Sequence, residues 1–555
     1  MFSPDVLLWV YPLLLIVPNV ALDITEYSSA WTKAANILLP FGVYVLLMGI
    51  WKNVGRTGLL LFPILFYGAF QIVLLYLYGE SIIAVDMFLN LVTTNVSEAT
   101  ELLGNLAIAI ITVVIIYIPA LIWCIIAAVR KQLASLKNLG RARQTGVACI
   151  LFGLACMIMA YTFDVRFSIR QDIFPVNVIN NTIIAVKRTE ATANYFATSS
   201  NFTYNAHSTR PGDQKEVYVL VIGETSRADN WQLFGYGRPT NPRLVKRPEL
   251  LAFPKTLSES NTTHKSVPLI MSWVSADNFG DSIYTSKSLI SAFNEAGFRT
   301  AYLSNQGRNH SFIDFFAREA QKTVFLTDSG SHHDEELLPL LRTFIDKSPS
   351  NKILVVLHTY GSHFNYSDRY TQSHRHYTPD SNTDADAFNR QSLVNAYDNT
   401  IEYTDYILDE VIKILEGQNC LAGMIYMSDH GEDIFDDARN RFLHASPVPT
   451  YWQIHVPMII WMSPQMMREY SDMYINARRH TVCNVSSSRS VFDTMLQLGG
   501  IDTRYADGTK SLLDTAYREA PRKYLNDHNE SVTLEKAGLR DYDFDMLEKK
   551  NISEK

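Results

Sequence analysis

The chain has 555 residues, too many for one ordinary domain, and a net charge of −7. The negative charge, and the lack of a Lys/Arg stripe interleaved with aromatic residues after Phe163, argue against nucleic acid as a partner. The hydrophobic content of 47% averages two parts, because apolar runs dominate up to Phe163 and a soluble α/β pattern follows. Of the five cysteines, Cys420 and Cys483 lie in the second part, so it can hold at most one disulfide. The sequence does not show whether these two cysteines pair.

The part up to Phe163 is predicted to span a membrane five times. Most of its apolar stretches reach the roughly 20 residues that a helix needs to cross a bilayer; they cover 5–22, 34–51, 57–79, 102–129 and 144–163. The loops after the second and fourth stretches are basic, whereas the loop 80–101 is acidic, with Asp86 and Glu98. By the positive-inside rule the basic loops and the N-terminus face the cytoplasm. We therefore expect 1–163 to anchor a large extracytoplasmic part.

Three segments are expected after the anchor. Residues 164–213 form a connector whose Ile- and Val-rich stretch 173–186 either lies on the membrane surface or packs as a bridging helix. Residues 214–523 alternate short apolar strands with helical stretches, which is typical of a mainly parallel sheet covered by helices. Residues 524–555 are charged and are expected to form a solvated or loosely docked tail. The strand candidates are 217–222, 299–303, 352–357, 421–427 and 456–462.

Acidic and imidazole side chains follow several of these strands, and one more histidine lies beyond the last of them. They are Glu224, His363, Asp429, His430 and His444. Because parallel strands end at the same edge of a sheet, we expect these side chains to converge there. Carboxylate and imidazole groups together suit a divalent metal with mixed oxygen and nitrogen ligands. The pattern therefore predicts a zinc-type site with room for a second ion.

A nucleophile for such a site is expected among the hydroxyl side chains near the first strand and near 256–268. A serine or threonine hydroxyl is a weak nucleophile near neutral pH unless a metal ion or a base activates it. The start of a helix favours a developing anion, although hydroxyls there often serve only as helix caps. On the residues alone four candidates remain: Thr225, Ser226, Thr262 and Thr263.

Six short motifs follow one another along the chain. They are VIGETSRADN (221–230), GYGRPTNP (235–242), THKSVP (263–268), LVNAYDNT (393–400), SDHGE (428–432) and FLH (442–444). In order, in spacing and in the five preceding spans, the chain resembles the membrane phosphoethanolamine transferases that modify lipid A and related envelope glycans. These include polymyxin-resistance enzymes and belong to the alkaline phosphatase/sulfatase superfamily. The resemblance covers the whole chain and implies a sulfatase-like domain after the membrane helices.

The resemblance also implies roles for individual residues. It implies that the catalytic zinc ion is bound by Glu224, Thr263, Asp429 and His430. It selects Thr263 as the nucleophile, because Thr263 stands three residues before the Ser-Val-Pro element. Thr225 would then be a supporting residue.

Further side chains are expected to line this site. His363 and His444 would act in catalysis and bind a second zinc ion or the transferred phosphate. Contacts to substrate are expected from Asn305, Gln306 and His310. Three positions depart from the family's usual pattern. Glu-Ser-Asn (259–261) replaces a Cys-Gly pair, Lys265 lies close to the nucleophile, and His310 stands near where relatives often carry a lysine.

The activity implied is zinc-dependent transfer of phosphoethanolamine from phosphatidylethanolamine, through a covalent phosphothreonine, to lipid A, lipopolysaccharide or another envelope glycan. The implied setting is a membrane-embedded monomer in the bacterial inner membrane with its catalytic domain in the periplasm. Two alternatives remain open on the sequence. One keeps the fold and changes the substrate, giving a phosphoglycerol transferase, a phosphatase or a sulfatase. The other is a non-enzymatic anchored module with a structural metal.

Overall fold

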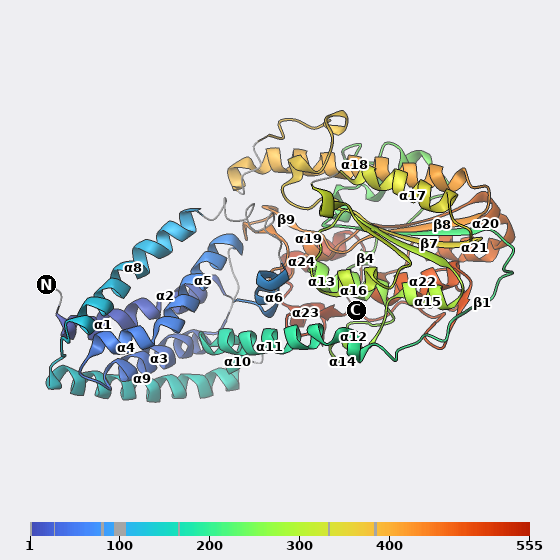
Figure 1. Cartoon of the computed structure of the whole chain (residues 1–555). Helices are drawn as coiled ribbons and strands as arrows, with labels where there is room; N and C mark the ends of the chain where they lie inside the picture. Colours follow the sequence, from blue (N-terminus) through green and yellow to red (C-terminus); the bar gives the residue numbers. More distant parts are fainter. Residues whose placement is uncertain are drawn as a thin grey trace. The chain divides into compact units, whose positions relative to one another are not determined.

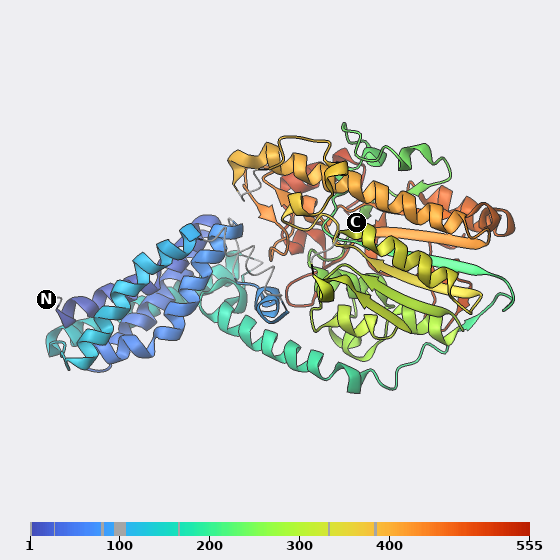
Figure 2. The ribbon, with the colours of Figure 1, turned by 45° about the horizontal axis from the view of Figure 1, so that its top comes forward.

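The computed structural model describes residues 3–26, 28–78, 83–93, 107–164, 167–330, 333–381 and 386–554. The chain divides into two compact units (Figures 1 and 2). The first comprises most of the chain up to Lys187, and the second runs from Arg188 to the C-terminal end. The division falls inside the helix α11 (Val176–Ala193).

The first unit consists of helices, several of them long and apolar enough to cross a membrane. Four candidate spans are found among the described residues: Pro4–Thr25, Ala30–Met48, Ile108–Val129 and Leu136–Phe163. They correspond to α1 (Pro4–Leu15) with α2 (Val17–Thr25), α3 (Ala30–Met48), α8 (Ala107–Val129) and α9 (Leu136–Phe163). A fifth span results if α4 (Val54–Leu60) and α5 (Phe62–Tyr78), which meet at a bend of 55°, count as one. The predicted multi-span helical unit is therefore confirmed. Its third predicted stretch, 57–79, lies in the bent pair α4 and α5.

Packing in this unit is typical of membrane helices. A Cβ atom on Gly42 of α3 would lie 2.8 Å from the carbonyl oxygen of Gly146 in α9, so glycine allows these two helices to approach closely. Helix α8 instead leaves Ile108, Ile111 and Ile115 exposed, as expected for a helix that faces lipid. The predicted acidic loop 80–101 lies largely outside the described residues; within it, α6 (Val85–Thr93) is helical.

The second unit is built on a seven-stranded sheet with the order β3-β11-β8-β2-β7-β5-β6. Five adjacent strands are parallel: β8 (Leu421–Ser428), β2 (Glu216–Gly223), β7 (Lys352–His358), β5 (Arg299–Ser304) and β6 (Lys322–Phe325). The strand β11 (Met458–Met462) pairs antiparallel with β8 and with β3 (Leu251–Ala252). The mainly parallel sheet is therefore confirmed. The strands β3 and β6 are not among the predicted ones.

Helices cover both faces of this sheet (Figure 1). One layer contains α13 (Thr263–Met271), α15 (Leu289–Glu295), α16 (Phe312–Ala317) and α22 (Ser487–Leu498). The other contains α17 (Leu337–Asp346) and α18 (Arg390–Glu416). Every residue of β2 is buried, because alternate side chains of a central strand point into opposite layers. Strand β2 is thus the buried central strand that its apolar run predicts.

The stretch 206–214, which looks like a linker in the sequence, is held by the second unit. Strand β1 (His207–Ser208) pairs with β13 (Ile501–Asp502). The Arg210 guanidinium lies 3.0 Å from the Glu216 carboxylate, and the Lys352 ammonium lies 2.6 Å from the other oxygen of that carboxylate. All three side chains are buried, so Glu216 at the start of β2 has two cationic partners.

The C-terminal segment is folded and packed, which corrects the prediction of a solvated or loosely docked tail for 524–555. It forms β14 (Tyr524–Leu525), β15 (Ser531–Val532), α23 (Leu534–Ala537) and α24 (Asp541–Lys549). Leu534, Leu547 and Ile552 are buried in a cluster with Tyr451 and Ile454 of α19 (Tyr451–Ile454). Many charged residues separate the apolar ones in this segment, so the small hydrophobic face that they form is not evident from the sequence.

Candidate active site

The ends of three adjacent parallel strands deliver the acidic and imidazole groups to one place. Glu224 follows β2 directly, and Asp429 and His430 follow its neighbour β8. His363 lies in the loop after β7, which pairs with the other edge of β2. Glu224, Asp429 and His430 are all buried. Their convergence at the carboxyl edge of the sheet agrees with the strand pattern of the sequence.

Thr263 reaches these side chains from the helix layer that covers the sheet, because it is the first residue of α13. Its hydroxyl oxygen lies 3.2 and 3.4 Å from the two carboxylate oxygens of Glu224 and 3.1 Å from Nε2 of His430. Nε2 of His430 lies 3.3 Å from an oxygen of Asp429. All four residues of the predicted zinc set therefore come together.

The other three hydroxyl candidates are engaged elsewhere. The Thr225 hydroxyl donates to Glu224 at 2.8 Å, and the Ser226 hydroxyl accepts a hydrogen bond from the Trp231 indole at 2.8 Å. The Thr262 hydroxyl lies 3.2 Å from that of Ser260. Of the four, only Thr263 lies between Glu224 and His430.

The backbone around Glu224 and Asp429 fixes the positions of these two residues. Asp429 accepts hydrogen bonds from the backbone N–H groups of Thr225, at 3.2 Å, and His430, at 2.7 Å. Thr225 has a φ of 60°, an uncommon backbone conformation for a non-glycine residue. Gly361, with a φ of 54°, leaves no room for a Cβ atom, which would lie 2.7 Å from the carbonyl oxygen of Glu224. The loop that carries His363 therefore packs directly against the Glu224 segment.

The protonation states suit binding of a cation. Nδ1 of His430 lies 2.9 Å from the carbonyl oxygen of Gly431, which can only accept, so Nδ1 carries the proton and Nε2 presents a lone pair. Burial, together with nearby His444, holds the pKa of His430 well below its usual range. Burial raises the pKa of Asp429, against the effect of its two backbone donors. A cation would offset this cost of burying carboxylates, so the donor set fits a divalent metal.

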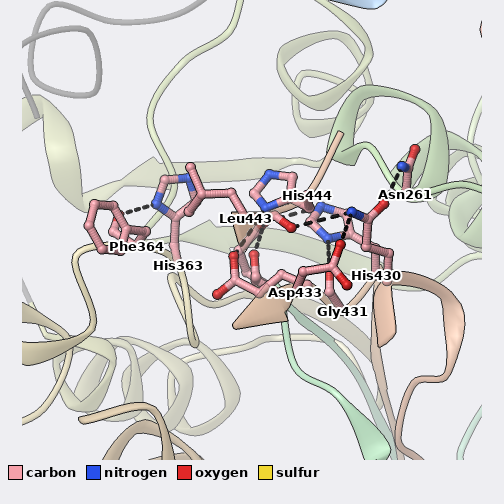
Figure 3. Close-up of polar contacts among 12 residues, drawn as sticks. Asn261, His363, Phe364, His430, Gly431, Asp433, Leu443 and His444 are labelled. Atoms are coloured by element: carbon pink, nitrogen blue, oxygen red, sulfur yellow. Dashed lines mark hydrogen bonds and ion pairs between the residues drawn. The ribbon is translucent and has the colours of Figure 1, made fainter. Parts of the chain in front are cut away.

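His444 and His363 flank the group (Figure 3). The His444 ring lies 4.2 Å from the His430 ring and 6.0 Å from the His363 ring, measured between centroids. Ligand atoms of Glu224, His430 and His444 all lie within 4.8 Å of one another. Nδ1 of His363 donates to the carbonyl oxygen of Phe364 at 2.6 Å, and burial with nearby Arg369 and His444 lowers its pKa to about 3.

The three residues predicted to contact substrate, Asn305, Gln306 and His310, lie in different surroundings. The Gln306 amide donates to a Glu224 carboxylate oxygen at 3.0 Å, so it supports a site residue. The Asn305 amide donates to Asp334 at 2.9 Å, and Asp334 also accepts the N–H of Gly361 at 3.0 Å. The His310 side chain is 80% exposed, and its Nδ1 lies 3.8 Å from an oxygen of Asp314, which also accepts the backbone N–H of His310 at 2.8 Å.

Two site residues have no role in the sequence-based interpretation. The Ser266 hydroxyl lies 3.4 Å from an oxygen of Asp429, one turn of α13 beyond Thr263. A carboxylate oxygen of Glu432, a buried residue, lies 3.4 Å from Nδ1 of His444 and orients that ring. Glu432 closes the SDHGE motif and Ser266 lies in THKSVP, so their positions in the motifs were the available signals.

A family model described as Sulfatase matches residues 216–501, just over half of the chain. The chain belongs to the sulfatase family. This confirms the superfamily that the six motifs indicate. The match begins at β2 and includes every residue of the site described above.

Curated relatives match part of the sequence, and one solved structure shares the fold over most of the chain. The phosphoethanolamine transferase EptA of Salmonella typhimurium is 31% identical over 318 residues, which are 55% of this chain and 57% of that protein. The chain thus spans about half the length of the curated relatives it matches. The integral membrane lipooligosaccharide phosphoethanolamine transferase A of Neisseria meningitidis shares the fold with a TM-score of 0.74 at 22% identity, over 92% of this chain and 98% of that one. The periplasmic domain of EptC from Escherichia coli, solved as a complex with Zn, has a TM-score of 0.54 at 23% identity, over 61% of this chain and 97% of that one.

Proposed function

We propose that this protein transfers phosphoethanolamine from phosphatidylethanolamine to lipid A or a related envelope glycan. The observation that carries the proposal is the hydroxyl of Thr263, held between the Glu224 carboxylate and Nε2 of His430. The named activity of the relatives and the shared two-unit fold support the choice of reaction. The membrane helices support a lipid donor, and the proposed setting is a monomer in the bacterial inner membrane with the second unit in the periplasm.

Zinc is the proposed cofactor, because the donor set is two carboxylates, a hydroxyl and a neutral imidazole. Glu224, Thr263, Asp429 and His430 would hold one ion, and the flanking His363 and His444 leave room for a second. Zinc bound there would supply a Lewis acid that stabilises negative charge on the transferred phosphate. The zinc-bound Escherichia coli domain of the same fold is consistent with this choice.

The proposed reaction has two displacements at phosphorus. In the first, a bond forms between the Thr263 oxygen and phosphorus while the bond to diacylglycerol breaks, and the Thr263 hydroxyl proton passes to Glu224, which accepts its hydrogen bond. In the second, an oxygen of the acceptor attacks the phosphothreonine and releases Thr263, which takes that proton back from Glu224. His444 is the proposed proton donor to the diacylglycerol oxygen and the later acceptor of the attacking group's proton. The Glu432 carboxylate beside Nδ1 of His444 would stabilise the protonated ring.

The test is mass analysis of the purified, detergent-solubilised protein after incubation with phosphatidylethanolamine, with phosphatidylglycerol in parallel. We expect a phosphoethanolamine adduct that maps to Thr263 and is absent in Thr263→Ala. Thr262→Ala, which removes the neighbouring hydroxyl, is the matched control and should still form the adduct. A glycerophosphate adduct would indicate a phosphoglycerol transferase instead. No adduct from either lipid with zinc-loaded protein would refute the proposal.

A further inference from the structure

His444 is carried by a strained turn. The residues on both sides of it, Leu443 and Ala445, have φ angles of 67° and 63°. Non-glycine residues rarely adopt positive φ, and each such residue costs free energy that the surrounding structure has to offset. Two such residues around one histidine therefore require specific contacts that hold the turn.

Two buried residues with amide side chains supply these contacts. The Gln453 amide donates to the carbonyl oxygen of Leu443 at 3.3 Å, and the backbone carbonyl of Asn261 accepts the N–H of Ala445 at 3.2 Å. The Asn261 amide also donates to the carbonyl oxygen of Ser446 at 2.8 Å. The exposed fractions of Asn261 and Gln453 are 3% and 1%, so both amides are shielded from bulk water and need these hydrogen bonds.

The two amides also bind each other and the rest of the site. The Asn261 amide donates to the side-chain oxygen of Gln453 at 2.6 Å, and the Gln453 amide donates to Asp433 at 2.7 Å. The backbone carbonyl of Gln453 accepts the N–H of Gly431, next to His430, at 2.8 Å. Asn261 itself lies two residues before Thr263. Figure 3 shows Asn261 and Asp433 beside His430 and the turn at Leu443 and His444.

We propose that Asn261 and Gln453 are positioning residues that hold the strained Leu443–His444–Ala445 turn, and with it His444, against the segment that carries Thr263. This inference rests on the proposed function, because it assigns His444 a part in that reaction. Without the Gln453 amide, the carbonyl oxygen of Leu443 loses its hydrogen-bond donor, and the turn can relax to an extended backbone. The His444 ring would then move away from Glu432 and His430.

The activity test is a double-mutant cycle with Gln453→Met, which keeps the side-chain length and removes both polar atoms. We expect Gln453→Met to lower the rate of phosphoethanolamine transfer by about 10- to 100-fold, up to the lower limit of the ~10²–10⁴-fold contribution of a proton-transfer group, because the ring is displaced and not removed. In a His444→Ala background the same substitution should cost less than about threefold, because coupled residues are not additive. Full additivity of the two losses, or transfer unaffected by Gln453→Met, would overturn the proposal.

Controls separate positioning from a general loss of stability. Asn476 is a matched residue, a buried amide in the same unit that donates to the carbonyl oxygen of Leu513 at 3.1 Å. Asn476→Leu should lower the melting temperature by an amount similar to Gln453→Met and leave the transfer rate unchanged. If Gln453→Met fails to fold, Asn261→Ala replaces it in the cycle, because it removes the amide bonded to Ser446 and Gln453.

A second readout does not depend on any activity. Diethylpyrocarbonate labelling of each histidine is measured by peptide mass analysis, with His480, whose ring donates to the carbonyl oxygen of Leu512, as internal reference. We expect His444 to be labelled several-fold faster in Gln453→Met than in the wild type, with His480 unchanged. Unchanged labelling of His444 would refute the positioning role. Faster labelling in a protein that transfers nothing from phosphatidylethanolamine would refute only the proposed function.

Discussion

Glu259 provides a sharp test of the electrostatics near the nucleophile. It lies four residues before Thr263 and is 6% exposed. Its carboxylate accepts the N–H of Ser488 in the first turn of α22 at 3.3 Å. Burial raises its pKa to about 7, although the hydrogen bond from Ser488 acts in the opposite direction. We therefore predict that Glu259→Gln changes stability in a pH-dependent way.

The sign follows from proton linkage. Between pH 4.5, the ordinary pKa of glutamate, and about 7, the folded protein keeps the Glu259 proton while the unfolded chain has lost it. The folded state therefore loses stability as pH rises through this window, whereas a glutamine side chain at this position does not titrate. With about 1.4 kcal/mol per pKa unit, the stabilisation by Glu259→Gln should be about 2.5 kcal/mol larger at pH 8 than at pH 5. For a unit of this size that difference corresponds to roughly 3 °C in melting temperature.

The assay is thermal unfolding of the detergent-solubilised protein at pH 5 and pH 8, for the wild type and Glu259→Gln. Glu548→Gln on the exposed face of α24 is the control and should show the same melting-temperature difference from the wild type at both pH values. The reasoning is refuted if Glu259→Gln shifts the melting temperature equally at the two pH values, or shifts it upward only at pH 5.

Four further outcomes are expected. Gln306→Leu should weaken zinc binding about 10- to 100-fold in a metal titration, because the carboxylate of a proposed ligand loses its amide donor; unchanged zinc affinity would return Gln306 to a substrate role. His310→Ala should change transfer by less than about twofold, since the side chain is 80% exposed, and a tenfold loss in the transfer assay would contradict this. Lys352→Met should destabilise the second unit by about 3–5 kcal/mol in denaturant unfolding, because it leaves Glu216 buried with one cation fewer; adding Glu216→Gln should recover part of the loss, and no recovery would speak against the pairing. Leu547→Ala should cost about 2–4 kcal/mol if the C-terminal segment is part of the folded unit, whereas a change near zero in the same measurement would indicate a detachable tail.

The sequence indicates the main elements of the fold because their signals are local. Apolar length predicts the spanning helices, and the run at β2 predicts a strand buried on both faces. The positions of Glu224, Asp429 and His430 directly after strands predict that they converge, since parallel neighbours end at one edge. The strand β6 escapes detection because its residues Lys322–Phe325 are few and partly exposed.

The choice among the hydroxyls could not be made from residue patterns alone. Thr225 follows Glu224 and looks as well placed as Thr263, but its positive φ turns its hydroxyl onto the Glu224 carboxylate. Thr263 reaches the site from 39 residues away because α13 packs against the sheet. The resemblance to a family had to supply this choice at the level of sequence.

By itself, the sequence determined the two-part organisation and the family, and it predicted which residues would bind a metal, since hydropathy, strand ends and short motifs are properties of neighbouring residues. Only the tertiary structure decided how those residues are supported. It placed Gln306 behind Glu224, turned His310 to solvent and folded the C-terminal segment onto the second unit. It also joined Asn261 to Gln453 across 192 residues to hold the turn at His444. Such contacts depend on which segments meet in space and on side-chain direction, and packing of the whole unit sets both.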